Sequence, residues 1–215
     1  MKKRVAALIS GRGSNMTSLI AAAKDPAFPA QIALVLSNRP DAAGLETARR
    51  EGIEAVALDH KAYATREEFE RAMQEVLLAH NIDIVCLAGF MRLLTPWFVE
   101  QWSGKMLNIH PALLPLYKGL HTHERALADG VKLHGATVHF VVPGMDEGPI
   151  IAQAAVPVLS ADTPETLGAR VLQQEHKLYP LALRLLAAGA LQIDGARVLI
   201  TKESATTGAL ISPDL

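Results

Sequence analysis

Two polar side chains stand close together in an otherwise apolar run of the sequence. Asn108 and His110 are separated by one residue in Met106-Leu107-Asn108-Ile109-His110-Pro111. If this run is a strand, alternate side chains point to the same face, so an amide and an imidazole would lie side by side. An amide can donate to a developing oxyanion, and an imidazole can donate to it or move protons, which suits acyl transfer. A structural pair that holds the following loop in place is the alternative interpretation.

A carboxylate further along the chain could complete this group. Asp146 lies in Pro143-Gly144-Met145-Asp146-Glu147-Gly148-Pro149, a loop bounded by Gly and Pro between two predicted strands. Such a loop can hold a carboxylate rigidly beside a cleft, where it would favour the imidazolium form of His110. The alternative is an ordinary turn aspartate, which is the commoner case for a residue taken alone.

A glycine-containing loop near the start of the chain predicts an anion site. Ser10-Gly11-Arg12-Gly13-Ser14-Asn15 stands between a predicted strand and a predicted helix, where free N–H groups favour phosphate. A dinucleotide fingerprint would need a third glycine at Met16, and an acidic ribose ligand where Ser37-Asn38 stand. The loop therefore indicates one phosphate or a mononucleotide, and an ordinary tight turn is the alternative.

A group of histidines raises the question of a metal site. His121-Thr122-His123-Glu124, together with His134 and His139, has a spacing that matches no structural zinc pattern. Cys86 is the single cysteine, which excludes a disulfide scaffold and a multi-cysteine zinc ribbon, and we interpret it as a buried apolar residue. We therefore expect no metal.

The elements that must position these groups alternate along the first half of the chain. Apolar runs predict strands over 5–9, 32–36, 54–58 and 84–87, and amphipathic runs predict helices over 14–24, 41–50 and 65–80. This alternation predicts an α/β fold, namely a Rossmann-like, doubly wound, mostly parallel sheet with flanking helices. In such a sheet ligands bind beyond the carboxyl ends of the strands, where Asn108 and His110 would lie.

The second half of the chain is less regular. We expect helices over 96–102 and 124–128, strands over 106–109, 136–142 and 150–158, and a long helix after Thr163-Pro164-Glu165. Asp194-Gly195 predicts a hairpin between 191–193 and 197–200. We predict a single domain over residues 1–203, with two halves, 1 to about 105 and about 106 to 203, followed by a flexible tail over 204–215.

Composition narrows the class of protein. The chain has 215 residues, half of them hydrophobic, with 21 basic and 22 acidic side chains and a net charge of −1. This balance disfavours a broad electrostatic nucleic-acid binder and a basic membrane-surface protein. No stretch approaches the ~20 apolar residues of a membrane span. We expect a soluble cytoplasmic protein with neither nucleic acid nor membrane as a partner.

These residues also match a known family. The sequence closely resembles the phosphoribosylglycinamide formyltransferases, the small folate-dependent enzymes of purine synthesis. The Asn-x-His-Pro run and the Asp-x-Gly-Pro loop mark the wider formyltransferase superfamily, and the Gly-x-Gly-Ser-Asn loop and a Gln-Glu-His segment narrow it to this branch. The matching stretches keep the family's order, and they are 9–15, 87–94, 107–111, 119–123, 145–151, 174–176 and 178–180.

The resemblance implies a reaction. The chain would transfer the formyl group of 10-formyltetrahydrofolate to the amine of N1-(5-phospho-D-ribosyl)glycinamide, giving formylglycinamide ribonucleotide and tetrahydrofolate in de novo purine (IMP) biosynthesis. Asn108, His110 and Asp146 would be the catalytic trio. The partners would be these two small molecules, no metal would be needed, and the protein would be a monomer or a homodimer.

The resemblance also implies binding residues. Gly13, Ser14 and Asn15 would hold the substrate phosphate, and Glu175 the ribose. Leu172 is a departure, because relatives carry a polar residue there that can reach the phosphate. The first half of the domain would bind phosphate and the second half folate. The residues expected to line the folate cleft are Arg66, Met91, Arg92, Leu93, Leu94, Asn108, Val142, Pro143, Gly144 and Met145.

Three other functions would use parts of the same pattern. Formyltetrahydrofolate deformylase would use a similar trio to hydrolyse the formyl group, but usually carries an extra N-terminal domain, and here the first strand begins near residue 5. Methionyl-tRNA formyltransferase needs a further C-terminal domain to hold tRNA, and this chain is short and not basic. A non-catalytic nucleotide-binding module would keep the glycine loop without needing the trio.

Overall fold

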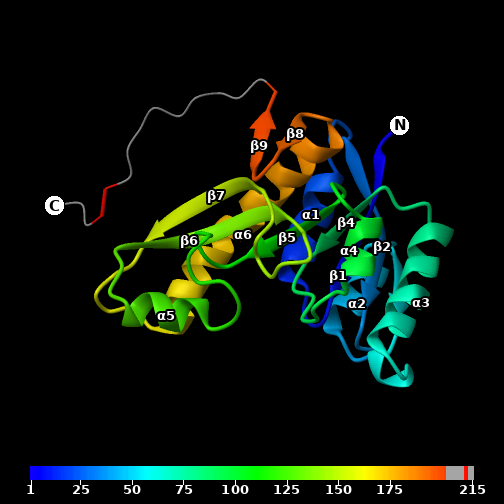
Figure 1. Cartoon of the computed structure of the whole chain (residues 1–215), viewed down its shortest axis with the longest axis horizontal. Coiled ribbons are helices and arrows are strands. Elements are labelled where there is room, and N and C mark those ends of the chain that lie inside the picture. Colours follow the sequence, from blue (N-terminus) through cyan, green and yellow to red (C-terminus); the bar gives the residue numbers. More distant parts are fainter. Residues whose placement is uncertain (202–210, 213–215) are drawn as a thin grey trace.

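One sheet runs through the centre of the structure. The computed structural model describes residues 1–201 and 211–212, and within them seven strands pair in the order β3-β2-β1-β4-β5-β6-β7 (Figure 1). The five strands from β3 to β5 are parallel, whereas β6 and β7 are antiparallel to their neighbours. The strands are β1 (Lys3–Ile9), β2 (Ala30–Ser37), β3 (Glu54–Ala57), β4 (Ile84–Leu87), β5 (Met106–His110), β6 (Leu133–Phe140) and β7 (Ile150–Pro157). The prediction of a doubly wound, mostly parallel sheet is confirmed.

Helices cover both faces of this sheet because its central strands are apolar on both sides. Val5 and Ala7 of β1 belong to a core with α1, α2 and α6, and Ala6 and Leu8 belong to a second core with α3 and α4. The helices are α1 (Ser14–Ala23), α2 (Ala43–Arg50), α3 (Arg66–Ala79), α4 (Pro96–Gln101), α5 (Thr122–Ala128) and α6 (Pro164–Ala187), and a 3₁₀ turn, η1, spans His60–Ala62. The alternation of side chains along a strand therefore feeds two separate cores.

The C-terminal part of the fold differs little from the predicted elements. The predicted hairpin is β8 (Leu191–Asp194) with β9 (Arg197–Ile200). Two boundaries shift: β5 includes His110, and α5 begins at Thr122 because His121 adopts a left-handed conformation that starts the helix two residues earlier than expected. The predicted tail, 204–215, lies outside the described residues except for 211–212.

The predicted division into two halves falls inside the sheet. It lies between β4 and β5, which pair as parallel neighbours, so the backbone hydrogen bonding continues across it. The division of labour between a phosphate half and a folate half stays a prediction. In the part of the chain that the structure describes, no helix has the length and apolar character needed to cross a membrane.

A buried tyrosine links the longest helix to the strands that carry the site. Tyr179 of α6 is fully buried, and its hydroxyl donates to the carbonyls of Leu87 (3.0 Å) and Leu107 (3.1 Å) at the ends of β4 and β5. Burial raises the pKa of this hydroxyl well above its ordinary value, so it stays a donor. Burial also raises the pKa of the neighbouring Cys86 thiol to about 12, which fits a packing role and not a nucleophile.

Candidate active site

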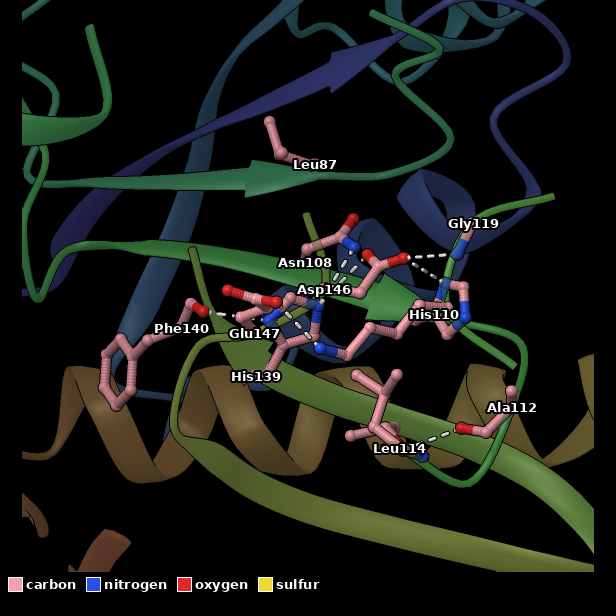
Figure 2. Close-up of polar contacts among 12 residues, drawn as sticks. Leu87, Asn108, His110, Ala112, Leu114, Gly119, His139, Phe140, Asp146 and Glu147 are labelled. Atoms are coloured by element: carbon pink, nitrogen blue, oxygen red, sulfur yellow. Dashed lines mark hydrogen bonds and ion pairs between the residues drawn. The ribbon is translucent and has the colours of Figure 1, made fainter. Parts of the chain in front are cut away.

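The end of β5 presents an amide and an imidazole side by side. Asn108 and His110 project from the same face of the strand, and His110 is 5% exposed (Figure 2). The Nε2 atom of His110 lies 2.9 Å from the carbonyl oxygen of Tyr117. Because a carbonyl only accepts, Nε2 carries a proton in this arrangement.

Asp146 comes to this imidazole from the loop between β6 and β7. It has a left-handed backbone, with φ at 55°, which turns its side chain back toward β5. Its Oδ2 atom lies 3.4 Å from His110 Nδ1 and accepts the backbone N–H of Gly119 at 2.8 Å. A proton on each ring nitrogen of His110 satisfies both of its contacts at once, so the geometry favours an imidazolium beside the carboxylate.

A second histidine, His139, orients the amide of Asn108. Its Nδ1 atom donates to the Phe140 carbonyl at 2.8 Å, and its Nε2 atom lies 3.2 Å from Asn108 Nδ2 (Figure 2). Burial lowers the pKa of His139, so the ring is neutral and Nε2 accepts from the amide. The second N–H of the Asn108 amide then remains available to a ligand. His139 Nε2 also lies 3.8 Å from Asp146 Oδ1.

Our sequence reasoning placed His139 beside the site without giving it a role. The signal that could have found it is strand pairing, because His139 stands directly opposite Asn108 in the antiparallel register of β5 and β6. Tyr117 and Gly119, which contact His110 and Asp146 through their backbones, were also missed. A backbone contact leaves no signature in residue type, so nothing in the sequence marked them.

The glycine loop lies at the start of α1. Gly13 has a left-handed backbone, with φ at 70°, and precedes the first helical residue, Ser14, which is exposed. Asn15 is buried, and its Nδ2 atom donates to Glu175 Oε2 of α6 at 2.6 Å. Burial raises the pKa of Glu175, and the Asn15 hydrogen bond opposes that shift. The Oδ1 atom of Asn15 is buried without a hydrogen-bond partner among the described residues.

A single cleft of about 660 Å³ connects these groups. The catalytic trio, Asn15, Glu175, and the segments 91–94 and 142–145 all line it. Of the residues expected at the site, Gly13 and Ser14 are outside the lining, as is Arg66, which begins α3. The structure thus brings together residues predicted for phosphate, ribose, folate and catalysis, and leaves Arg66 beyond the edge of the cleft.

The histidine group does not form a metal centre in the described residues. No cluster of three or more His, Cys, Asp or Glu side chains there is arranged to hold an ion. His123 and His134 contact each other instead, with Nδ1 and Nε2 separated by 3.2 Å. Burial lowers the pKa of both rings, that of His134 to about 4, so this pair is neutral at pH 7.

Comparison with known proteins identifies the family. Residues 3–183 match the sequence model of the family described as formyl transferase. A phosphoribosylglycinamide formyltransferase from Escherichia coli (strain K12) is 45% identical over 189 residues, which cover 88% of this chain and 89% of that protein. The chain belongs to the phosphoribosylglycinamide formyltransferase family.

Other phosphoribosylglycinamide formyltransferases share the fold. Glycinamide ribonucleotide transformylase 1 from Symbiobacterium toebii matches with a TM-score of 0.90 at 48% identity, covering 93% of this chain and 94% of that one. The trifunctional purine biosynthetic protein adenosine-3 of Homo sapiens is 51% identical over 203 residues, which cover 94% of this chain but only 20% of that longer protein. These names favour the transferase over the deformylase and the non-catalytic module.

Proposed function

We propose that this chain transfers the formyl group of 10-formyltetrahydrofolate to the amino group of N1-(5-phospho-D-ribosyl)glycinamide. The observation that carries the proposal is the convergence of Asn108, His110 and Asp146 in one cleft with Asn15 and Glu175. An amide donor, an imidazole and a carboxylate within contact distance form a set that suits acyl transfer. The neighbouring polar groups suit a ribose phosphate.

The folate side of the cleft carries apolar side chains that solvent reaches. Met91 is 68% exposed, Leu93 60% and Met145 53%, and all three line the cleft. Apolar side chains gathered around a hollow are typical of a site for a flat, largely apolar ligand, with polar groups fixing its orientation. We therefore assign the pterin and the adjoining ring of the folate to the segments 91–94 and 142–145.

The ribonucleotide side of the cleft offers unused hydrogen-bonding capacity. The buried Oδ1 atom of Asn15 has no partner among the described residues, so a hydroxyl or N–H donor of the substrate would satisfy it. Gly13 starts α1 with a backbone that leaves the first N–H groups of the helix free for a phosphate. Leu172 supplies no polar contact, so the phosphate would depend on the loop and on Gln173, which is exposed one residue further on.

The proposed reaction passes through a tetrahedral intermediate. The substrate amine attacks the formyl carbon, and the oxygen becomes an oxyanion that accepts the free N–H of Asn108. The oxyanion also takes the place of the Tyr117 carbonyl as acceptor for His110 Nε2–H. Asp146 holds the Nδ1 proton. The amine loses one proton, and N10 of the folate gains one as tetrahydrofolate leaves.

The test is formyl transfer by the purified protein, followed through the change in folate absorbance. We expect tetrahydrofolate to form only when N1-(5-phospho-D-ribosyl)glycinamide is present, and we expect EDTA to leave the rate unchanged. Loss of the formyl group without the amine would instead indicate a deformylase. Binding of both ligands without turnover would indicate a non-catalytic module.

A further inference from the structure

A second hollow, of about 320 Å³, lies beside the active-site cleft. We call it the Arg92 pocket, and its side-chain walls come from Ser10, Asn38, Arg39, His60, Met91 and Arg92. It lies at the carboxyl ends of β1, β2 and β4, where ligands bind in sheets of this kind. Gly89, Met91 and Arg92 line both hollows, so the two are contiguous, whereas the catalytic trio lines only the larger one.

The floor of the Arg92 pocket is a connected set of polar groups. Ser10 Oγ donates to Asn38 Oδ1 at 2.6 Å and accepts the backbone N–H of Met91 at 2.8 Å. Ser10 and Asn38 are both more than nine-tenths buried, so these hydrogen bonds hold the floor in place. His60 Nδ1 donates to the Asn38 carbonyl at 2.8 Å, which leaves Nε2 as the ring atom able to contact a ligand.

Cationic side chains form the rim of the pocket. Arg92 lies over the ring of Phe69, and its Nε atom is buried without a hydrogen-bond partner among the described residues. Arg39 contributes a second guanidinium, which makes two contacts with the exposed carboxylate of Asp41, at 3.2 and 2.8 Å. An exposed ion pair of this kind is weak, so Arg39 can exchange Asp41 for a ligand carboxylate. These features fit an anionic ligand.

We propose that the Arg92 pocket receives the γ-linked glutamates that extend the tail of the folate cosubstrate. The proposal rests on the proposed function, which puts the folate rings against the segments 91–94 and 142–145. A tail leaving that cleft over Met91 and Arg92 enters the Arg92 pocket directly, because the same residues line both. Each added γ-linked glutamate brings one carboxylate, and Arg39, His60 and Arg92 supply donors for it.

The test compares 10-formyltetrahydrofolate carrying one and three glutamates. With the wild-type chain we expect the triglutamate to have a KM lower by roughly three- to tenfold at equal kcat, as two exposed charged contacts would give. Arg39→Gln and His60→Ala should bring the two KM values together while leaving kcat with the monoglutamate unchanged. Lys61→Ala is the matched control, since it removes a neighbouring charge that does not line the pocket, and it should keep the difference.

Equal KM values in the wild-type chain, or a difference that survives both pocket substitutions, would overturn the proposal. Calorimetry with unreactive folic acid and its triglutamate separates this outcome from failure of the proposed function, because it needs no turnover. The triglutamate should bind more tightly than folic acid to the wild-type chain and equally to Arg39→Gln. If adenosine 5′-monophosphate bound instead, and Arg39→Gln abolished that binding without any preference for the triglutamate, the pocket would be a nucleotide site and the proposal would be wrong.

Discussion

At the scale of single residues, the protons of the catalytic centre are positioned by partners that can only accept. The Phe140 carbonyl fixes the proton of His139 on Nδ1, and the resulting Nε2 acceptor orients the amide of Asn108. The Tyr117 carbonyl and the Asp146 carboxylate do the same for the two nitrogens of His110. The donors that would meet an oxyanion are therefore oriented before substrate arrives, which is what makes such donors effective.

Removing the Asn108 amide tests this arrangement. Asn108→Ala should lower kcat by about 10²–10³-fold, because one oxyanion donor typically contributes roughly 3–4 kcal/mol to the barrier. The residue is only half-buried and its partner His139 can accept from water, so the melting temperature should hardly change. Steady-state kinetics and thermal melting measure the two effects, and near-normal turnover in this variant would contradict the oxyanion role of Asn108.

At the scale of elements, the turn between β6 and β7 must approach β6 closely to deliver Asp146. A Cβ atom on Gly148 would lie 1.7 Å from the carbonyl oxygen of Phe140, so only glycine fits there. Gly148→Ala should displace the loop and lower kcat by ~10²-fold, as expected when a catalytic group is misplaced by about an ångström. The matched control is Gly144→Ala, whose Cβ would meet only the flexible end of the Glu147 side chain. Equal effects of the two substitutions on kcat would show that the close approach does not position Asp146.

The contact between α5 and β6 should make the fold sensitive to acid. His123 and His134 share one contact, and burial holds the pKa of His134 at about 4 instead of 6.5. Since the unfolded chain takes up a proton at the higher pH, stability is lost as pH falls from 6.5 toward about 4, by roughly 1–3 kcal/mol. His134→Gln should flatten the fall of unfolding free energy over this range, measured by urea denaturation at several pH values. A slope identical to that of the wild-type chain would exclude His134 as its source.

At the scale of the whole molecule, α6 ties the two ends of the sheet's centre together. Its Tyr179 hydroxyl bridges the carbonyls of β4 and β5, and its Glu175 carboxylate meets Asn15 of α1. These strand ends carry the Met91–Leu94 loop and the catalytic pair. One helix thus connects the phosphate side of the cleft to the strands that support the reacting groups.

Loss of this bridge should destabilise the fold. Tyr179→Phe leaves the ring in place but removes a donor to two buried carbonyls, so the free energy of unfolding should fall by about 1–3 kcal/mol. Urea denaturation measures the change. Tyr63→Phe is the control, because it keeps the edge-on ring contact with Phe69 and alters a less buried hydroxyl. Unfolding free energies equal to the wild type in both variants would show that the bridge is energetically neutral.

Sequence patterns predicted the parts of this structure that depend on neighbours along the chain. Apolar runs separated by amphipathic helices predicted the parallel sheet, because periodicity records which side of an element is buried. The single-residue spacing of Asn108 and His110 predicted that they share a face, because side chains alternate along a strand. Boundaries such as the start of α5 were missed, since the left-handed turn at His121 depends on its surroundings.

Tertiary structure alone decided which distant groups meet. His139 faces Asn108 across 31 residues of chain, and Glu175 reaches Asn15 across 160. These contacts follow from strand order, antiparallel register and the path of α6, which local periodicity does not encode. The sequence by itself thus determined the chemistry each strand end could offer, and the packing of the sheet decided which of those groups share one cleft.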